Sequence, residues 1–461
     1  MRTPNRRLIA ITVPLVATAL LVAGCSGGGS GAGSAGDAKS VADVTDAQLK
    51  GATIEMARFF GDCSDDIGTS TDLSAAVGEC ATIQTLTNKF NAENEWGITV
   101  DRLGGAAWDS YYDTLNSAFA GGNPPDVAIM HGSSLVDYAN RGLLLPIDDL
   151  VDVADIDLAD AVPAAKTAIS YDGTNYAVPF DVHAALAHLN VDLFTAAGLV
   201  NADGTPKLPT STEEFLADAK TLEDKTGKKY FAVATSGDAL GVHVFESLLD
   251  QQGSGVLNED GTQANIDTPE AIESLGFMNE VFSAGYAEEN KTYDAAQESF
   301  LKGDAAMLFN GTWVVDQYNG TAPFTYEATN FPTLYEEPGV WADSHTWTIP
   351  VQKDADPVKY RAALEFISFL YEHDADWALG TGHISARESV LNSDAYKAAP
   401  QRASYADTGL TVAHPVPHIA SWPAVSKALI GSVESVWFQG EDVDKALKDG
   451  SSSIDSVLGG K

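Results

Sequence analysis

Tryptophans beside short polar segments are the residues of this chain best suited to ligand chemistry. The chain has eight tryptophans. Trp313 follows Asn310-Gly311-Thr312, Trp422 lies between a serine and a proline, and Trp347 follows Ser344-His345-Thr346. Flat rings cover the C–H faces of a sugar, and fixed polar groups bind its hydroxyls. The pattern favours a carbohydrate ligand, and the alternative is that these rings fill hydrophobic cores.

Polar side chains that follow predicted strands are the candidates for binding hydroxyl groups. His131 and Ser133 come directly after a strand predicted at 126–130. Open α/β sheets bind ligands at the carboxyl ends of their strands. Asp62 and Asp65 follow the first predicted strand in the same way. A histidine that only completes structural hydrogen bonds is the alternative interpretation of His131.

Patterns typical of catalysis and metal binding fail in their context. Glycoside hydrolysis needs two carboxylates at a defined separation, and among 65 acidic residues the sequence neither identifies nor excludes such a pair. The turn at 258–261 lacks the ligand spacing of a calcium loop, and the acidic stretch 148–160 is typical of a solvated face. Residues 24–28 match the nucleophile elbow of hydrolases, and residues 31–36 match the glycine-rich fingerprint of dinucleotide-binding proteins. Neither segment follows a predicted strand or begins a predicted helix, so neither motif has its required context. We expect no catalytic residue, metal or cofactor, and a glycoside hydrolase is a less favoured alternative.

The first 25 residues have the organisation of an export signal. Three arginines lie within the first seven residues, and residues 8–22 are mostly apolar. A tract of Gly, Ser and Ala follows Cys25. Residues 21–25 resemble the cleavage box of bacterial lipoproteins, in which the cysteine carries the lipid. This resemblance implies a signal peptide at 1–24 and a lipidated Cys25 with a flexible linker at 25–50. The protein would then be anchored to the outer face of the bacterial cytoplasmic membrane, touching it only through the lipid. An uncleaved anchor helix is the alternative.

The two remaining cysteines predict a disulfide. Cys63 and Cys80 form an even pair in an exported protein. Closing a loop of this length stabilises a fold by about 3 kcal/mol in the chain-entropy model. A thiol metal site is disfavoured because no histidines cluster with the pair.

Charge and length limit the class of protein. The formal net charge of −38 disfavours binding to nucleic acid phosphates and anionic lipids. The charge also allows a cationic solute, so a binder of polyamines or peptides is an alternative. With 461 residues, the chain is longer than one core usually holds, and we expect two lobes.

Alternating strand and helix patterns predict an α/β fold with mostly parallel sheets. Trp377 and Trp437 fall on predicted helices and are expected in the core. Strands are predicted at 53–60, 98–100, 126–130, 184–190 and 230–235, and helices at 83–92, 108–120, 135–141, 212–226, 243–251, 269–284 and 361–379.

Four segments, in order, resemble the sugar-binding subunits of ABC importers. They are 122–127 with 138–144, 178–180 with 189–199, 300–307 with 310–313, and 381–387. The resemblance implies an α/β, two-lobed periplasmic-binding-protein-like fold of type II, with the ligand in a cleft between lobes joined by hinge strands. One lobe would hold 51–180 and 345–392, and the other 184–342 and 396–461. Lobe closure around the ligand would signal a membrane permease.

The resemblance also assigns site residues. Trp313 and Trp422 match ring-stacking positions, and His183 matches the place of a ligand-contacting acid. The loop bridged by cysteines resembles α-glucoside-binding members, which implies trehalose, maltose or sucrose as ligand. We also expect the protein to act as a monomer. The remaining expected ligand contacts are Asp181 after the hinge motif and Gly382 and His383 in the segment 381–387. His345 and Trp347, in the polar segment 344–347, are expected contacts from their residue types alone.

Overall fold

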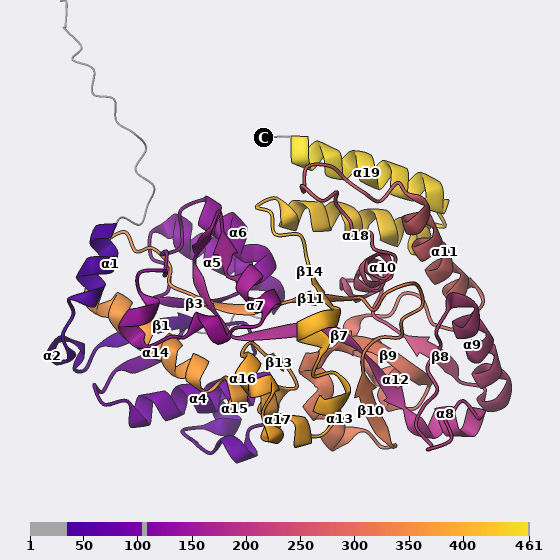
Figure 1. Ribbon diagram of the computed structural model, residues 1–461, viewed down its shortest axis with the longest axis horizontal. Coiled ribbons are helices and arrows are strands. Elements are labelled where there is room, and N and C mark those ends of the chain that lie inside the picture. Colours follow the sequence, from indigo (N-terminus) through magenta and orange to yellow (C-terminus); the bar gives the residue numbers. More distant parts are fainter. Residues whose placement is uncertain (1–34, 104–107, 460–461) are drawn as a thin grey trace, which may run out of the picture. The chain divides into compact units, whose positions relative to one another are not determined.

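Two β-sheets, each assembled from distant parts of the chain, organise the protein (Figure 1). The structure, a computed structural model, describes residues 35–103 and 108–459. The expected signal peptide, Cys25 and the start of the linker lie outside the described residues. In the described part of the chain, no helix is long and apolar enough to cross a membrane.

The first sheet has the strand order β2-β1-β3-β12-β6. β1 pairs in parallel with β2 and β3, whereas β12 is antiparallel to β3 and β6. The expected parallel arrangement therefore holds for three strands, and the sheet is mixed because β12 enters from a much later part of the chain. The strands are β1 (Thr53–Ala57), β2 (Thr99–Arg102), β3 (Val127–His131), β6 (Ala177–Pro179) and β12 (His345–Thr348).

The second sheet is built around β7 (Asp181–Asn190), all ten residues of which are buried. β7 pairs antiparallel with β9, β10, β11 and β13. Parallel pairing is confined to the β8–β9 and β11–β14 pairs of this sheet, so it is also mixed. Its other strands are β8 (Lys229–Ala232), β9 (Ala305–Gly311), β10 (Tyr326–Thr329), β11 (Val340–Asp343), β13 (Ile384–Ser385) and β14 (Ala413–Pro415).

Helices that pack on the first sheet begin earlier in the chain than expected. Val41 and Leu49 are fully buried in the first hydrophobic core, so residues 41–50 belong to the fold and not to a flexible linker. These apolar side chains anchor two short helices that pack on α14. The helices of this half are α1 (Ala35–Ala42), α2 (Asp46–Leu49), α3 (Ser64–Ile67), α4 (Glu79–Glu93), α5 (Tyr111–Gly121), α6 (Gly132–Asn140), α14 (Pro357–Glu372) and α15 (Asp374–Thr381).

A second core lies around β7, β8 and β9. α9 shows why its residues form a helix: Ser211 caps its start by accepting a hydrogen bond from the Glu214 amide, and Gly227 ends it in the left-handed conformation. The yellow helices α18 and α19 pack on each other (Figure 1). The helices of this half are α7 (Pro163–Ala168), α8 (Val191–Ala197), α9 (Thr212–Thr226), α10 (Leu240–Asp250), α11 (Pro269–Ser283), α12 (Tyr293–Leu301), α13 (Val315–Thr321), α16 (Glu388–Leu391), α17 (Asp394–Ala398), α18 (Trp422–Gln439) and α19 (Val443–Gly459).

The long helix expected at 361–379 is two helices. α14 ends at Glu372 and α15 begins at Asp374, and His373 between them has a φ of −95° and a ψ of 21° that depart from helical geometry. The turn directs Asp374 inward, where its carboxylate accepts hydrogen bonds from Ser385 Oγ and the Ala386 amide. The hydrophobic spacing continues across the break, which is why the sequence predicts one helix.

Among the described residues, three segments around β7 cross between the two cores, and α7 packs in the second core between residues of the first. Phe180 belongs to the first core and Val182 to the second, so the chain crosses at the start of β7. A second crossing runs from Ala342 to Trp347, and the third lies between Trp377 and Ile384. Ile384 packs in the second core, whereas the resemblance implies a first lobe that extends to 392.

Candidate functional site

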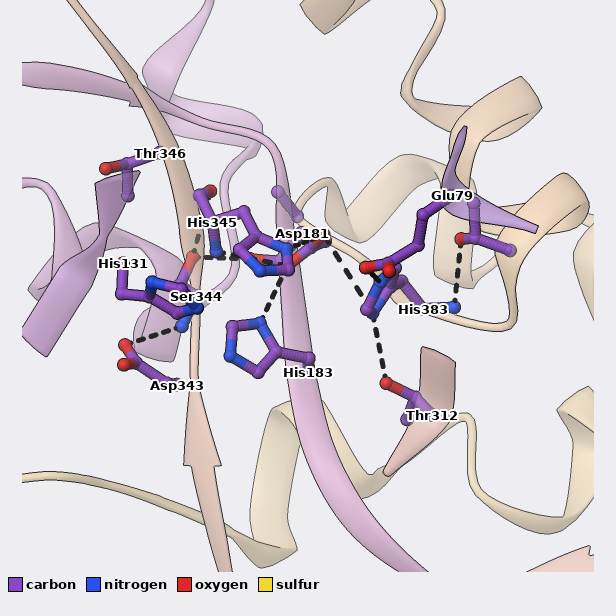
Figure 2. A network of polar contacts seen from close by, with 12 residues as sticks. Glu79, His131, Asp181, His183, Thr312, Asp343, Ser344, His345, Thr346 and His383 are labelled. Carbon is purple, nitrogen blue, oxygen red and sulfur yellow. Dashed lines mark hydrogen bonds and ion pairs between the residues drawn. The ribbon is translucent and has the colours of Figure 1, made fainter. Parts of the chain in front are cut away.

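Asp181 lies at the centre of a buried group of histidines, each on or next to a crossing segment (Figure 2). His345 Nδ1 donates a hydrogen bond to Asp181 Oδ2 at 2.8 Å, and His183 Nδ1 donates to Oδ1 at 3.2 Å. His383 Nδ1 lies 3.9 Å from Asp181 Oδ2. The side chains of Asp181 and His383 are fully buried, and those of His183 and His345 are at most 5 % exposed. We call these four residues the Asp181 cluster.

Hydrogen bonds from outside the cluster fix its orientation. His383 Nε2 donates to Glu79 Oε1 at 2.9 Å, and its Nδ1 lies 3.1 Å from the Thr312 hydroxyl. Trp377 Nε1 donates to Asp181 Oδ2 at 2.8 Å. Gly382 lies in the left-handed conformation, and a Cβ there would lie 2.2 Å from the Thr312 carbonyl oxygen. Gly382 therefore allows the close approach of α15 to the turn before Trp313.

Burial and neighbouring charges divide the ionisation states in the cluster. Burial alone would raise the pKa of Asp181, but His345 and His383 hold that pKa well below its usual value. Burial acts to lower the pKa of His345, and the Asp181 charge more than offsets it, so the pKa is raised. Burial lowers the pKa of His183. Asp181 is therefore an ionised carboxylate, the His345 imidazole readily becomes charged, and the His183 imidazole stays neutral.

His131 extends the site toward the first sheet. Its ring stacks on Phe59 with centroids 4.7 Å apart and lies 5.0 Å from the His345 ring. Burial and the neighbouring His345 hold the pKa of His131 well below its usual value. The amide of Ser133, in the first turn of α6, donates to Asp343 Oδ1 at 3.1 Å, which links α6 to β11.

A cavity of about 430 Å³ opens beside the cluster. Trp341 forms part of its wall, and the Trp341 ring lies 5.9 Å from that of His183. His243 stacks on the indole with centroids 3.8 Å apart and fixes its plane. His418 also lines the cavity, and its Nε2 hydrogen-bonds to the Ser170 carbonyl.

The three expected ligand-binding tryptophans lie in different surroundings. Trp313 is half-buried, with its ring 6.0 Å from that of His183 and its Nε1 donating to Tyr293 Oη at 2.7 Å. Trp422 is 5 % exposed and packs in the second core. Trp347 is 1 % exposed in the first core, against Phe180, so its ring fills the interior. Only Trp313 of the three contacts the Asp181 cluster through an aromatic pair recorded in the described residues.

The expected disulfide between Cys63 and Cys80 is present, with Cα atoms 6.0 Å apart. Asp62 and Asp65 are exposed beside it. Hydrogen bonds from Ser64 and an ion pair with Arg102 lower the pKa of Asp62 to about 2. The structure thus brings His131, Asp181, His183, His345 and His383 together and leaves Asp62 and Asp65 outside the cluster.

Several residues of the site carry no strong sequence signal. In the sequence Glu79 is an ordinary acidic residue at the start of a helix, but in the structure its carboxylate accepts a hydrogen bond from His383. Trp377 is in the core as expected, but it also donates to Asp181. Trp341 lies within four residues of Ser344-His345, and its place before a crossing segment is the signal that could have identified it.

The fold defines a two-lobed solute-binding protein. Over residues 85–404 the chain matches the family described as bacterial extracellular solute-binding protein, and it belongs to that family.

Characterised relatives and solved structures agree with this family. The maltotriose-binding protein of Pyrococcus abyssi is 26% identical, over 62% of this chain and 60% of the relative. The diacetylchitobiose-binding protein DasA of Streptomyces coelicolor is 23% identical, over 82% of this chain and 88% of the relative. The crystal structure of the cyclic alpha-maltosyl-1,6-maltose binding protein from Arthrobacter globiformis superposes with a TM-score of 0.71, at 22% identity, and covers 89% of this chain and 99% of that one.

Proposed function

We propose that this protein is the extracytoplasmic carbohydrate-binding component of an ABC transporter. It captures a di- or oligosaccharide of the α-glucoside type by lobe closure and delivers it to the transmembrane permease. It binds the sugar without breaking a bond and acts as a monomer. The lipid on Cys25 tethers it to the outer face of the membrane.

The cavity walled by Trp341 carries this proposal. Its volume of about 430 Å³ lies within the range of small-molecule sites, roughly 300 to 1,000 Å³. An indole with its plane fixed by His243 suits a sugar face, and the carboxylates of Glu246 and Asp250 suit hydroxyl groups. Three relatives whose names state a saccharide ligand support the same class of solute.

Residues on the cluster side extend the proposed sugar site. Trp313 offers a half-buried ring near His183, and His131 supplies a polar group between the lobes. Asp343 accepts a hydrogen bond from the Ser133 amide, and this bond joins β11 in the second half to α6 in the first half beside the proposed site. In this proposal Trp347 and Trp422 support the site from the cores.

A cationic solute is the second candidate, because acidic side chains line much of the cavity. Burial raises the pKa of Asp250 to about 6, and His414 already pairs with this carboxylate, which leaves less negative charge to attract a cation. This cavity includes the following acids: Glu246, Asp250, Glu259 and Asp260.

Calorimetry separates the two candidates. We expect binding of at least one of maltose, trehalose and sucrose, and no binding of spermidine. Trp341→Ala should weaken sugar binding at least tenfold, equivalent to about 1.4 kcal/mol. The matched control is Trp96→Ala, a half-buried tryptophan that does not line the cavity. Binding of spermidine in place of every sugar would overturn the proposal.

A further inference from the structure

We propose that Asp181, His183, His345 and His383 form a binding site for a divalent transition-metal ion of the zinc type. The site lies at the meeting point of the three crossing segments, and it is separate from the proposed sugar cavity: none of the four residues lines that cavity. Three imidazoles and one carboxylate are the ligands that Zn²⁺, Co²⁺ and Ni²⁺ prefer over Ca²⁺ or Mg²⁺.

The spacing of the four side chains is close to that of a tetrahedral site. One ligand atom from each residue lies within 4.8 Å of all the others. From Asp181 Oδ2 the separations are 2.8 Å to His345 Nδ1 and 3.9 Å to His383 Nδ1, and from Oδ1 the separation is 3.2 Å to His183 Nδ1. Zinc–nitrogen bonds of about 2.0 to 2.1 Å place tetrahedral ligand atoms about 3.3 Å apart. No pair of ligand atoms therefore has to approach by more than about 1.5 Å to reach tetrahedral spacing.

Glu79 supplies an independent observation in favour of a metal. A histidine that binds a metal through one ring nitrogen commonly donates the other N–H to a carboxylate. His383 has this arrangement, because its Nε2 donates to Glu79 Oε1 at 2.9 Å while its Nδ1 faces Asp181. Nδ1 thus presents its lone pair toward the cluster and the Thr312 hydroxyl.

The proton balance of binding is simple. An ionised Asp181 only accepts hydrogen bonds, so His183 and His345 now carry protons on Nδ1. On metal binding each imidazole keeps one proton, on Nε2, and Nδ1 coordinates the ion. Any second proton on His345 passes to solvent. Trp377 Nε1 and the His345 amide continue to donate to the Asp181 carboxylate.

Cobalt titration of the full chain, stripped of metal by a chelator and free of any histidine tag, tests the site. We expect one Co²⁺ per chain, with the visible absorption of tetrahedral cobalt, and displacement by one equivalent of Zn²⁺. His383→Gln should lower Co²⁺ affinity at least about 100-fold, since it removes a ligand but keeps polar atoms for Glu79 and Thr312.

Two further variants keep the test decisive. His345→Gln should likewise lower Co²⁺ affinity at least about 100-fold. His414→Gln alters a histidine paired with Asp250 outside the cluster and should leave the affinity unchanged. Thermal unfolding without metal checks that each variant is folded. No cobalt absorption in the wild type, or equal cobalt affinity in the wild type and both cluster variants, overturns the inference. Sugar calorimetry with chelator present reports separately on the proposed function.

Discussion

Asp374 is a buried carboxyl group whose ionisation should control stability near neutral pH. Burial raises its pKa from 3.8 to about 7. At pH values between 3.8 and about 7, Asp374 is protonated in the folded protein and ionised in the unfolded chain. The free energy of unfolding should therefore fall as pH rises from about 4 to about 7, by at most about 4 kcal/mol.

Asp374→Asn should flatten this slope and leave the variant at least as stable as the wild type at pH 8, because the amide removes the buried charge. Denaturant unfolding at several pH values measures how the free energy of unfolding depends on pH in each protein. Asp72→Asn, at an exposed cap, serves as the control and should keep the slope. An unchanged slope in the Asp374 variant would assign it to another group.

Gly382 should be irreplaceable for packing reasons. Its φ of +97° disfavours any side chain, and a Cβ would lie 2.2 Å from the Thr312 carbonyl oxygen. Gly382→Ala should destabilise the fold by more than about 1 kcal/mol in denaturant unfolding. Gly276→Ala, in α11 with no atom within 4 Å of the new Cβ, should instead stabilise by about 0.5 to 1 kcal/mol. Equal effects of the two changes would contradict this account.

The sequence nominates several residues of the site without predicting their arrangement. Asp181, His183, His345 and His383 each follow a recognisable segment, but their convergence depends on three crossings separated by long stretches of chain. Trp347 illustrates the limit: its neighbours His345, Thr346 and Thr348 are polar, yet all four residues of β12 are buried, and the sequence does not show this.

At the scale of elements, strong local signals predict well. α9 spans Thr212–Thr226 as expected, because its cap residues and apolar spacing agree. The break at His373 and the packing of Val41 depend on contacts with distant parts of the fold. Neither composition nor hydrophobic periodicity indicates such contacts. At His373 and Val41, tertiary packing therefore determines a structure that differs from the one the local sequence predicts.

The disulfide is the element-scale feature with the largest expected effect. It closes a loop of 17 residues between the end of the β1 segment and α4, directly beside Glu79. Reduction should lower the free energy of unfolding by about 3 kcal/mol, measured in denaturant with and without reductant. Cys63→Ser with Cys80→Ser should match the reduced wild type and show no response to reductant. Equal stability of the oxidised and reduced chains would show that the bridge contributes nothing.

At the scale of the whole molecule, Asp343 should favour the closed arrangement. Its Oδ1 accepts the Ser133 amide at 3.1 Å, so it links β11 of the second sheet to α6 of the first core. Asp126 is a matched control, because it is also buried and accepts the Glu55 amide at 2.8 Å, but within the first core.

Lobe closure predicts different outcomes for the two acids. We expect that lobe opening breaks the hydrogen bond between Asp343 and Ser133. Asp343→Ala should then weaken sugar affinity about tenfold and reduce the ligand-dependent contraction in small-angle scattering, because it removes a contact of the closed state. Asp126→Ala should lower the melting temperature and leave both ligand responses intact. If both variants lost affinity and stability in parallel, Asp343 would be an ordinary structural acid and closure would depend on other contacts.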